Sequence, residues 1–137
     1  MNDCIFCKIA KKEIGSETVI YEDADFVSFL DLNPVNKGHA LIIPKSHYTD
    51  ILETNEKELS KMLILAKKLA VAIMKATDAK GFNLTINTKP EAGQTVFHTH
   101  LHIVPRFKGD GFEHWKGTPA SSEERSKVAK LIQQQLK

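Results

Sequence analysis

The chain has 137 residues, 42% hydrophobic and 26% charged, which is enough for one compact domain and too few for two typical ones. Its formal net charge of +2 gives no strong field for nucleic acid or an acidic membrane surface. No apolar stretch approaches the length of a membrane span, and the first residues lack the pattern of a secretory signal. We therefore expect a cytoplasmic protein that keeps its two cysteines reduced and binds neither nucleic acid nor membrane.

The first part of the chain is expected to form a short helix followed by strands. Over residues 3–12, Ile5, Phe6 and Ile9 share one helical face, and Asp3 can cap the start of the helix. Runs of β-branched and apolar residues then predict strands at residues 18–21, 26–30 and 39–43.

The clearest predicted helix extends from residue 55 to residue 77. Asn55 and Glu58 can form a capping pair at its start, and Gly81 is expected to close its end. Core packing explains its apolar pattern without any cofactor, because one buried stripe has this three- and four-residue spacing. The predicted stripe comprises Leu59, Met62, Leu63, Ala66, Leu69, Ala70 and Ile73.

The remaining predicted elements are two strands and a last helix. The strands are expected at residues 82–87 and 97–105, with a turn-rich loop between them. Ser121 and Glu124 form a capping box before the last helix. The apolar stripe of that helix comprises Val128, Leu131, Ile132 and Leu136. Together these elements predict an α+β fold, with an antiparallel sheet of about five strands, one long helix and short terminal helices.

Three histidines occupy alternate positions of the last predicted strand, at His98, His100 and His102. Because side chains alternate between the faces of a strand, the three imidazoles would line one face, about 6.5 to 7 Å apart. Such a row favours metal binding or chemistry near neutral pH, since polar rings without partners are costly to bury. The weaker interpretation is a set of half-exposed positions on the wet face of a sheet.

A metal site is one use for part of this row. Cys4 and Cys7 form a C-x-x-C pair, but no histidine follows it, which excludes covalent haem attachment. The pair also precedes every predicted strand, which argues against a thioredoxin-type redox site. A structural zinc ion needs four ligands, and His47 and His98 are the best candidates to complete the set. Spacing alone leaves zinc and two unligated thiols equally open.

The central histidine, His100, is the best candidate for a nucleophile, because a neutral imidazole can attack at pH 7 without a metal. The loop at residues 93–95 supplies backbone N–H groups that could hold an oxyanion, and the Thr95 hydroxyl could stabilise a leaving group. Asp31, at a strand end, could bind a sugar diol. An ordinary hairpin turn and a solvated aspartate are the alternatives for these two features.

At this point several segments resemble the histidine triad (HIT) nucleotide-binding hydrolases and transferases. Residues 98–104 match the family signature His-φ-His-φ-His-φ-φ, where φ is apolar, except that Thr99 stands at the first φ. Segments at residues 4–9, 29–34 and 38–45 resemble the Hint branch of bacterial type, namely its N-terminus, its nucleoside-binding segment and the strand with its fourth histidine. The resemblance covers nearly the whole chain and implies the HIT-like fold.

The resemblance also implies roles for matching residues. His100 corresponds to a nucleophile that attacks the α-phosphate and forms a nucleotidyl-histidine, which water then hydrolyses. His102 corresponds to a phosphate contact, and His39 to a residue that orients the nucleophile. Thr95 corresponds to a contact with the leaving group, and Asp31 to the ribose ligand. The full implied nucleotide-binding set, which includes the apolar walls of a purine pocket, is Ile5, Phe6, Ile9, Phe29, Asp31, Leu32, Asn87, Gly93, Gln94, Thr95, His100 and His102.

The metal, the assembly and the tail are covered by the resemblance as well. Some bacterial-type members hold structural zinc with two N-terminal cysteines and two histidines, and many members are homodimers. The implied Zn²⁺ ligands are Cys4, Cys7, His47 and His98. We expect one HIT domain over residues 1–137, with a core at 1–109 and a helical extension at 110–137. Trp115, in the extension, could reach a neighbouring subunit's site or cover the core, and the second placement is favoured.

These features lead to one preferred function and two alternatives. The preferred function is cleavage of the α-phosphoryl bond of nucleoside 5′-phosphoryl conjugates, of phosphoramidate or acyl-adenylate type, with release of a purine nucleoside monophosphate. This chemistry needs no cofactor beyond the structural metal. The alternatives are a dinucleoside polyphosphate hydrolase of the same family and a non-catalytic, zinc-dependent nucleotide-binding or interaction module.

Overall fold

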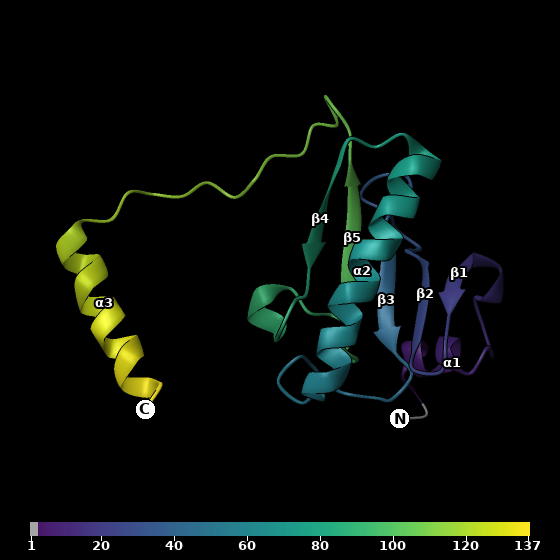
Figure 1. Cartoon of the computed structure of the whole chain (residues 1–137), viewed down its shortest axis with the longest axis horizontal. Helices are drawn as coiled ribbons and strands as arrows, with labels where there is room; N and C mark the ends of the chain where they lie inside the picture. Colours follow the sequence, from purple (N-terminus) through teal and green to yellow (C-terminus); the bar gives the residue numbers. More distant parts are fainter. Residues whose placement is uncertain (1–2) are drawn as a thin grey trace.

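The computed structural model describes residues 3–137 and contains five strands and three α-helices. The helices are α1 (Ile5–Ala10), α2 (Glu56–Thr77) and α3 (Ser122–Gln135). The strands are β1 (Val19–Glu22), β2 (Phe26–Leu30), β3 (Ala40–Pro44), β4 (Gly81–Thr85) and β5 (Leu101–Arg106). They form one antiparallel sheet in the order β1-β2-β3-β5-β4 (Figure 1). The predicted α+β fold is therefore confirmed.

The sheet separates two apolar cores because successive side chains of its central strands point to opposite faces. On one face α2 packs over residues such as Ile42, Leu101 and Ile103, which are at most 2% exposed. On the other face α1 contributes Phe6 and Ile9 to a smaller core of the inner strands β2 and β3. The histidine-bearing strand β5 lies between β3 and β4, so its side chains reach both faces.

The long helix α2 begins as predicted and buries nearly the predicted stripe. The Asn55 side chain accepts hydrogen bonds from the N–H groups of Lys57 and Glu58 at 2.9 and 3.3 Å. The prediction for Leu63 is wrong, since it is 57% exposed, and Leu65 is buried in its place. Leu63 faces the outer side of β4, and β4 is an edge strand with no further strand to cover it.

The end of α2 and the start of β5 also differ from the prediction. Asp78 caps α2 with a φ of 63°, so Gly81 is not the cap and instead begins β4. The predicted strand at residues 97–105 pairs only from Leu101 onward. The N–H of Thr99 donates to the carbonyl of Tyr48 at 2.8 Å, so this part of the backbone bonds to a loop rather than to a strand.

The C-terminal segment leaves the sheet after β5. Figure 1 shows α3 set apart at the end of an extended connection, and every residue from 111 to 137 is exposed. The Ser121 cap is confirmed, since its hydroxyl accepts from the N–H of Glu124 at 3.1 Å. The favoured placement of Trp115 over the core is wrong, because its side chain is 98% exposed. Within residues 3–137, none of the helices combines the length and apolar content needed to cross a membrane.

Candidate functional site

The histidine row lies on the α1 face of the sheet, as its alternation predicts. Along β5 the buried side chains Leu101 and Ile103 face α2, so His102 faces the other way. The rings of His100 and His102 are 4.9 Å apart between centroids, and the Phe6 ring on α1 meets that of His100 at 5.0 Å. The row therefore stays on one face, although only His102 belongs to the paired strand.

The four predicted metal ligands come together. Their ligand atoms, one from each of Cys4, Cys7, His47 and His98, all lie within 4.8 Å of one another. The Cys4 Sγ is 3.4 Å from the His98 Nδ1, and the Cys7 Sγ is 3.3 Å from the His47 Nδ1. A tetrahedral zinc ion with normal bond lengths places sulfur and nitrogen ligands about 3.5 Å apart. The spacing therefore fits zinc.

The surroundings of His98 prepare it as a ligand. Its Nε2 lies 2.8 Å from the main-chain oxygen of Pro44, which can only accept, so the proton resides on Nε2. The lone pair of Nδ1 then points into the cluster, as ligation requires. Burial lowers the pKa of His98 to about 4, so the ring is neutral at pH 7. Burial also raises the pKa of the Cys7 thiol, so a metal is needed to hold it as thiolate.

A second cluster, formed by Asp31, His39 and His102, is built differently. The N–H of Val35 donates to the Nδ1 of His39 at 3.0 Å, which places the proton of that ring on Nε2. This Nε2–H then donates to the Nδ1 of His102 at 2.9 Å. A metal on the Nε2 of His39 would drive the proton toward the Val35 N–H. The cluster is therefore a hydrogen-bond relay that leaves an N–H on the Nε2 of His102.

His100 is held in the tautomer that a nucleophile needs. Its Nδ1–H donates to the main-chain oxygen of His98 at 2.7 Å, so the lone pair is on Nε2. Burial lowers the pKa of His100, which keeps the ring neutral. Within residues 3–137 this Nε2 has no hydrogen-bond partner, and the one buried, unpaired side-chain polar atom is the Oε2 of Glu58. His100 itself is 6% exposed, and its Nε2 keeps a lone pair that no described residue engages.

The apolar residues of the implied purine pocket fall into two groups. Phe6, Ile9 and Phe29 are buried together beside the histidine row, and the rings of Phe6 and Phe29 meet at 5.6 Å. Ile5 is 46% exposed and Leu32 is 89% exposed, so these two lie at the surface. Their exposed apolar area is available to a ligand that stacks from outside.

The loop before the histidine row is braced by its own side chains. Gln94 is buried, and its amide donates to the carbonyls of Thr49 and Val96 at 2.7 and 3.1 Å. Its oxygen accepts from the N–H of Lys89 at 2.9 Å. The structure therefore places Gln94 as a support of the loop, with its polar atoms already used. Thr95 beside it is exposed.

Gly93 and Asn87 lie together at the same loop. Gly93 adopts a φ of 89°, in the region that favours glycine, and a Cβ there would meet the Nδ2 of Asn87 at 3.6 Å. These two members of the implied nucleotide-binding set are therefore neighbours. Asp31, at the other side of the histidine row, has its Oδ2 3.5 Å from the Nε2 of His39.

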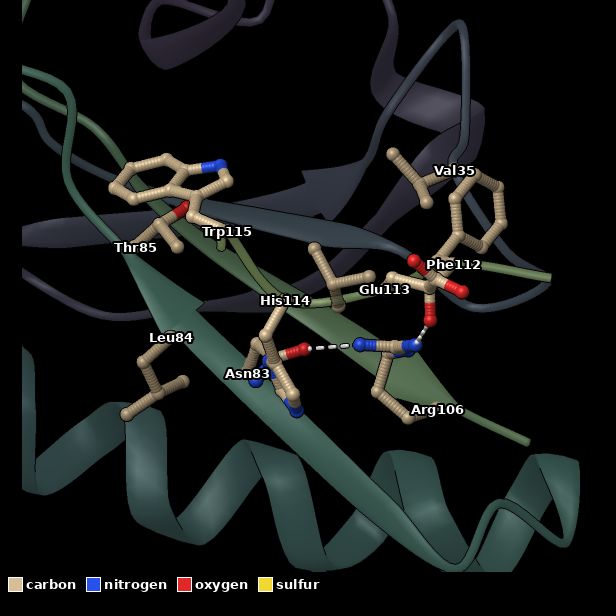
Figure 2. A pocket seen from close by; sticks show the side chains of 10 residues that line it. Val35, Asn83, Leu84, Thr85, Arg106, Phe112, Glu113, His114 and Trp115 are labelled. Carbon is tan, nitrogen blue, oxygen red and sulfur yellow. Dashed lines mark hydrogen bonds between the residues drawn. The ribbon is translucent and has the colours of Figure 1, made fainter. Parts of the chain in front are cut away.

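A pocket of about 500 Å³ beyond the histidine row was missed by the sequence reasoning (Figure 2). Val104 and Arg106 form part of its wall and continue the alternation of His102 along β5. The Arg106 guanidinium donates to both carboxylate oxygens of Asp110, at 2.8 and 3.0 Å, and to Asn83 at 2.9 Å. Its charge is thereby compensated, which disfavours an anion in this pocket. The sequence signal that could have found it is the two-residue alternation, which continues from His102 to Val104 and Arg106 on the same face of the strand.

Comparison with known proteins gives a consistent family match. A family model described as the HIT domain matches residues 11–109. An adenylylsulfatase of Arabidopsis thaliana is 44% identical over 109 residues, covering 80% of this chain and 55% of that protein. A protein of Bacillus subtilis named hit is 43% identical over 111 residues, covering 80% of this chain and 76% of that one.

Solved structures extend the match to the whole chain. A crystal structure from Streptococcus mutans has a TM-score of 0.92 and 40% identity, and the match covers 100% of this chain and 87% of that one. A zinc-bound histidine triad family protein from Mycobacterium smegmatis has a TM-score of 0.78 and 35% identity, covering 96% and 97%. A histidine triad nucleotide-binding protein from Candida albicans has a TM-score of 0.85 and 31% identity, covering 98% and 97%.

Proposed function

Because this chain belongs to the HIT domain family, we propose that it cleaves nucleoside 5′-phosphoryl conjugates through a nucleotidyl intermediate on His100. The observation that carries the proposal is the tautomer of His100. Its Nδ1–H is occupied by the His98 carbonyl at 2.7 Å, so a neutral Nε2 lone pair is left for attack. The similar proteins named for nucleotide binding and for adenylylsulfatase activity support an adenylyl group as the part transferred.

In the proposed first step the Nε2 of His100 attacks the α-phosphorus. The nitrogen–phosphorus bond forms as the bond to the leaving group breaks. The leaving group keeps the electron pair and takes a proton from solvent water, relayed through the exposed Thr95 hydroxyl. In the second step water attacks the phosphorus and the nitrogen–phosphorus bond breaks. The nucleoside monophosphate is released, and the neutral His100 is restored.

The relay from Val35 to His102 would stabilise charge on the phosphoryl group. His39 accepts the Val35 N–H at Nδ1 and donates its own Nε2–H to the Nδ1 of His102. The Nε2–H of His102 is therefore free to donate to a non-bridging phosphoryl oxygen. On the same face Asp31 would bind the ribose, and the Phe6 and Phe29 rings would form the inner wall of the base site. Asn87 and Gly93 would contact the phosphate from the loop.

We further propose that the chain holds structural Zn²⁺ and acts as a cytoplasmic homodimer. The four-ligand cluster and the zinc-bound protein from Mycobacterium smegmatis support the metal, which would join α1 to the sheet. Reduced thiols suit a cytoplasmic location. The open edge of β4 and the neighbouring exposed side chains Leu63, Ile64 and Phe82 support a two-fold interface.

The test compares His100→Ala with Gln134→Ala, a control on the exposed α3. On adenosine 5′-phosphoramidate we expect His100→Ala to lose at least about 10³-fold in turnover, because the nucleophile is gone. Binding of adenosine monophosphate, measured by calorimetry, should change less than about threefold. Undiminished turnover in this variant would end the proposal.

The two alternatives are separated by the same assay. A faster reaction on diadenosine polyphosphates than on the phosphoramidate would favour the dinucleoside polyphosphate hydrolase. Nucleotide binding without turnover of either substrate would favour the non-catalytic module. The tautomer of His100, with its lone pair on Nε2, favours an enzyme over the latter.

A further inference from the structure

The metal cluster and the proposed nucleophile share one residue. His98 directs its Nδ1 into the cluster, and its main-chain oxygen accepts the Nδ1–H of His100 at 2.7 Å. The ring of His98 is fixed at its other end by the bond to the Pro44 carbonyl. Any contact that fixes the position of His98 therefore also fixes its carbonyl oxygen, the acceptor that orients the His100 ring.

The sheet does little to hold this segment. Pairing of β5 with β3 and β4 begins at Leu101 and His102, so residues 98–100 lie outside the ladder. Thr99 anchors them to the rest of the chain, since its N–H bonds to the carbonyl of Tyr48 and its hydroxyl bonds to Thr54. The His98 ring adds its bond to the Pro44 carbonyl, and the ligand cluster is a third anchor on that side of the backbone.

A second connection runs through Phe6. This residue stands between the two cysteine ligands on α1, and its ring meets the His98 ring at 5.9 Å and the His100 ring at 5.0 Å, both edge to face. Helix α1 has six residues, too few to be stable alone, so it depends on its attachments. A metal on Cys4 and Cys7 would hold Phe6 against the nucleophile.

We propose that metal bound by Cys4, Cys7, His47 and His98 positions His100 for attack, through the His98 carbonyl and the Phe6 ring. The inference rests on the proposed function for its kinetic consequence. Without the metal, the His98 carbonyl and α1 each lose one of their attachments, and a shift of the carbonyl lets the His100 proton move to Nε2. A ring protonated there has no lone pair facing the substrate. His98 and Phe6 are thus positioning residues.

The first measurement follows the tautomer itself at a fixed pH of 7.5. Long-range proton–nitrogen NMR of the full chain would compare protein loaded with Zn²⁺, protein stripped by a chelator, and stripped protein reloaded with Zn²⁺. We expect one tautomer of His100, with its proton on Nδ1, in the two loaded samples and a mixture in the stripped one. The same single tautomer in all three would overturn the proposal. This readout does not require turnover, so it decides the inference even if the proposed function fails.

The second measurement is the rate of nucleotidyl-His100 formation at saturating adenosine 5′-phosphoramidate. We expect the stripped protein to be at least about tenfold slower, because misorientation of a reacting group costs rate even when substrate is bound. A loss confined to substrate affinity, with the saturating rate unchanged, would mean that the metal only holds α1 in place and would overturn the proposal. No adduct in Zn²⁺-loaded wild-type protein would instead count against the proposed function.

A rescue experiment covers the case in which stripped protein unfolds. His47 is a half-buried ligand that lies outside the histidine row, and His47→Ala leaves space for free imidazole. We expect Co²⁺ absorption and the saturating rate to fall together in this variant and to return together with imidazole. Metal binding that returns without the rate would contradict the positioning role. Lys8→Ala, on the exposed side of α1, is the matched control and should keep both.

Discussion

Main-chain groups decide which ring nitrogen carries the proton in three of the site histidines. Carbonyl oxygens face His98 and His100, so the free lone pair of His98 is on Nδ1 and that of His100 is on Nε2. An N–H faces His39, so its proton is on Nε2. Identical side chains thus become a metal ligand, a proposed nucleophile and a hydrogen-bond donor.

The first prediction concerns His102 and pH. Burial first, and then the neighbouring His100 and His39, lower its pKa to about 4 from an ordinary value of 6.5. The unfolded chain therefore binds more protons than the folded one between these values, and stability is lost as the pH falls through this window. Between pH 7 and pH 4.5 we expect the free energy of unfolding of His102→Gln to fall by about 2 kcal/mol less than that of the wild type. Urea unfolding at both pH values measures this, and parallel losses in the two proteins would refute it.

At the scale of single residues, sequence reasoning predicted which side chains come together but not the hydrogen bonds between them. The C-x-x-C pair and alternate histidines were visible because they are chemically distinctive at short spacing. Gln94 belongs to the implied nucleotide-binding set, and its three hydrogen bonds in the structure also brace a loop, which the sequence did not indicate. Thr99, which departs from the apolar family pattern, pairs its hydroxyl with that of Thr54 at 2.7 Å. Partners this distant in the chain leave no local pattern.

Among the elements, α2 shows how a sheet edge changes helix burial. The predicted stripe follows helical spacing alone, so it could not tell Leu63 from Leu65. The covering strands decide between them, and β4 ends the sheet on the side of Leu63. Helix existence was predictable from periodicity, whereas the exposure of one flank depended on strand order.

The second prediction compares two side chains of α2. Leu65 is 8% exposed and belongs to the larger core, whereas Val71 is 46% exposed. Leu65→Ala should lower the free energy of unfolding by about 2 to 4 kcal/mol, because it leaves a cavity. Val71→Ala should change it by less than about 1 kcal/mol. Chemical denaturation of both variants provides the comparison, and equal losses would contradict the assigned burial.

Element boundaries were the least predictable part of the fold. The start of β5 moved from residue 97 to Leu101 because the backbone of Thr99 bonds to Tyr48. The cap of α2 moved from Gly81 to Asp78, which adopts the left-handed conformation without being glycine. The first shift comes from a hydrogen bond that competes with strand pairing, and the second comes from a non-glycine residue that adopts a positive φ.

Across the whole molecule, the larger apolar core lies on one face of the sheet and the candidate functional site lies on the other. Helix α2 covers one side with the larger core, while α1, the ligand cluster and the histidines occupy the other. The segment after β5 adds no burial to either, since residues 111–137 are all exposed. The final helix was predicted from its cap and periodicity, but its separation from the sheet had no signal in the sequence.

The third prediction tests the proposed homodimer. Ile64 is 71% exposed beside the open edge strand β4. Ile64→Glu would bring a charge into an apolar interface, so we expect a shift from dimer to monomer in sedimentation velocity. Lys75→Glu, at the far end of α2, is the control for added negative charge and should remain dimeric. A wild-type chain that sediments as a monomer at all concentrations would exclude the interface.

The most direct measurement is mass spectrometry of protein quenched in base during turnover of adenosine 5′-phosphoramidate, since nucleotidyl-histidine bonds survive base better than acid. We expect a transient adduct of one adenylyl group on the peptide that contains residues 97–106, localised to His100 by fragmentation. The adduct should be absent in His100→Ala and present in Gln134→Ala. Full turnover with no adduct, or with the adenylyl group on another residue, would contradict nucleotidyl transfer through His100.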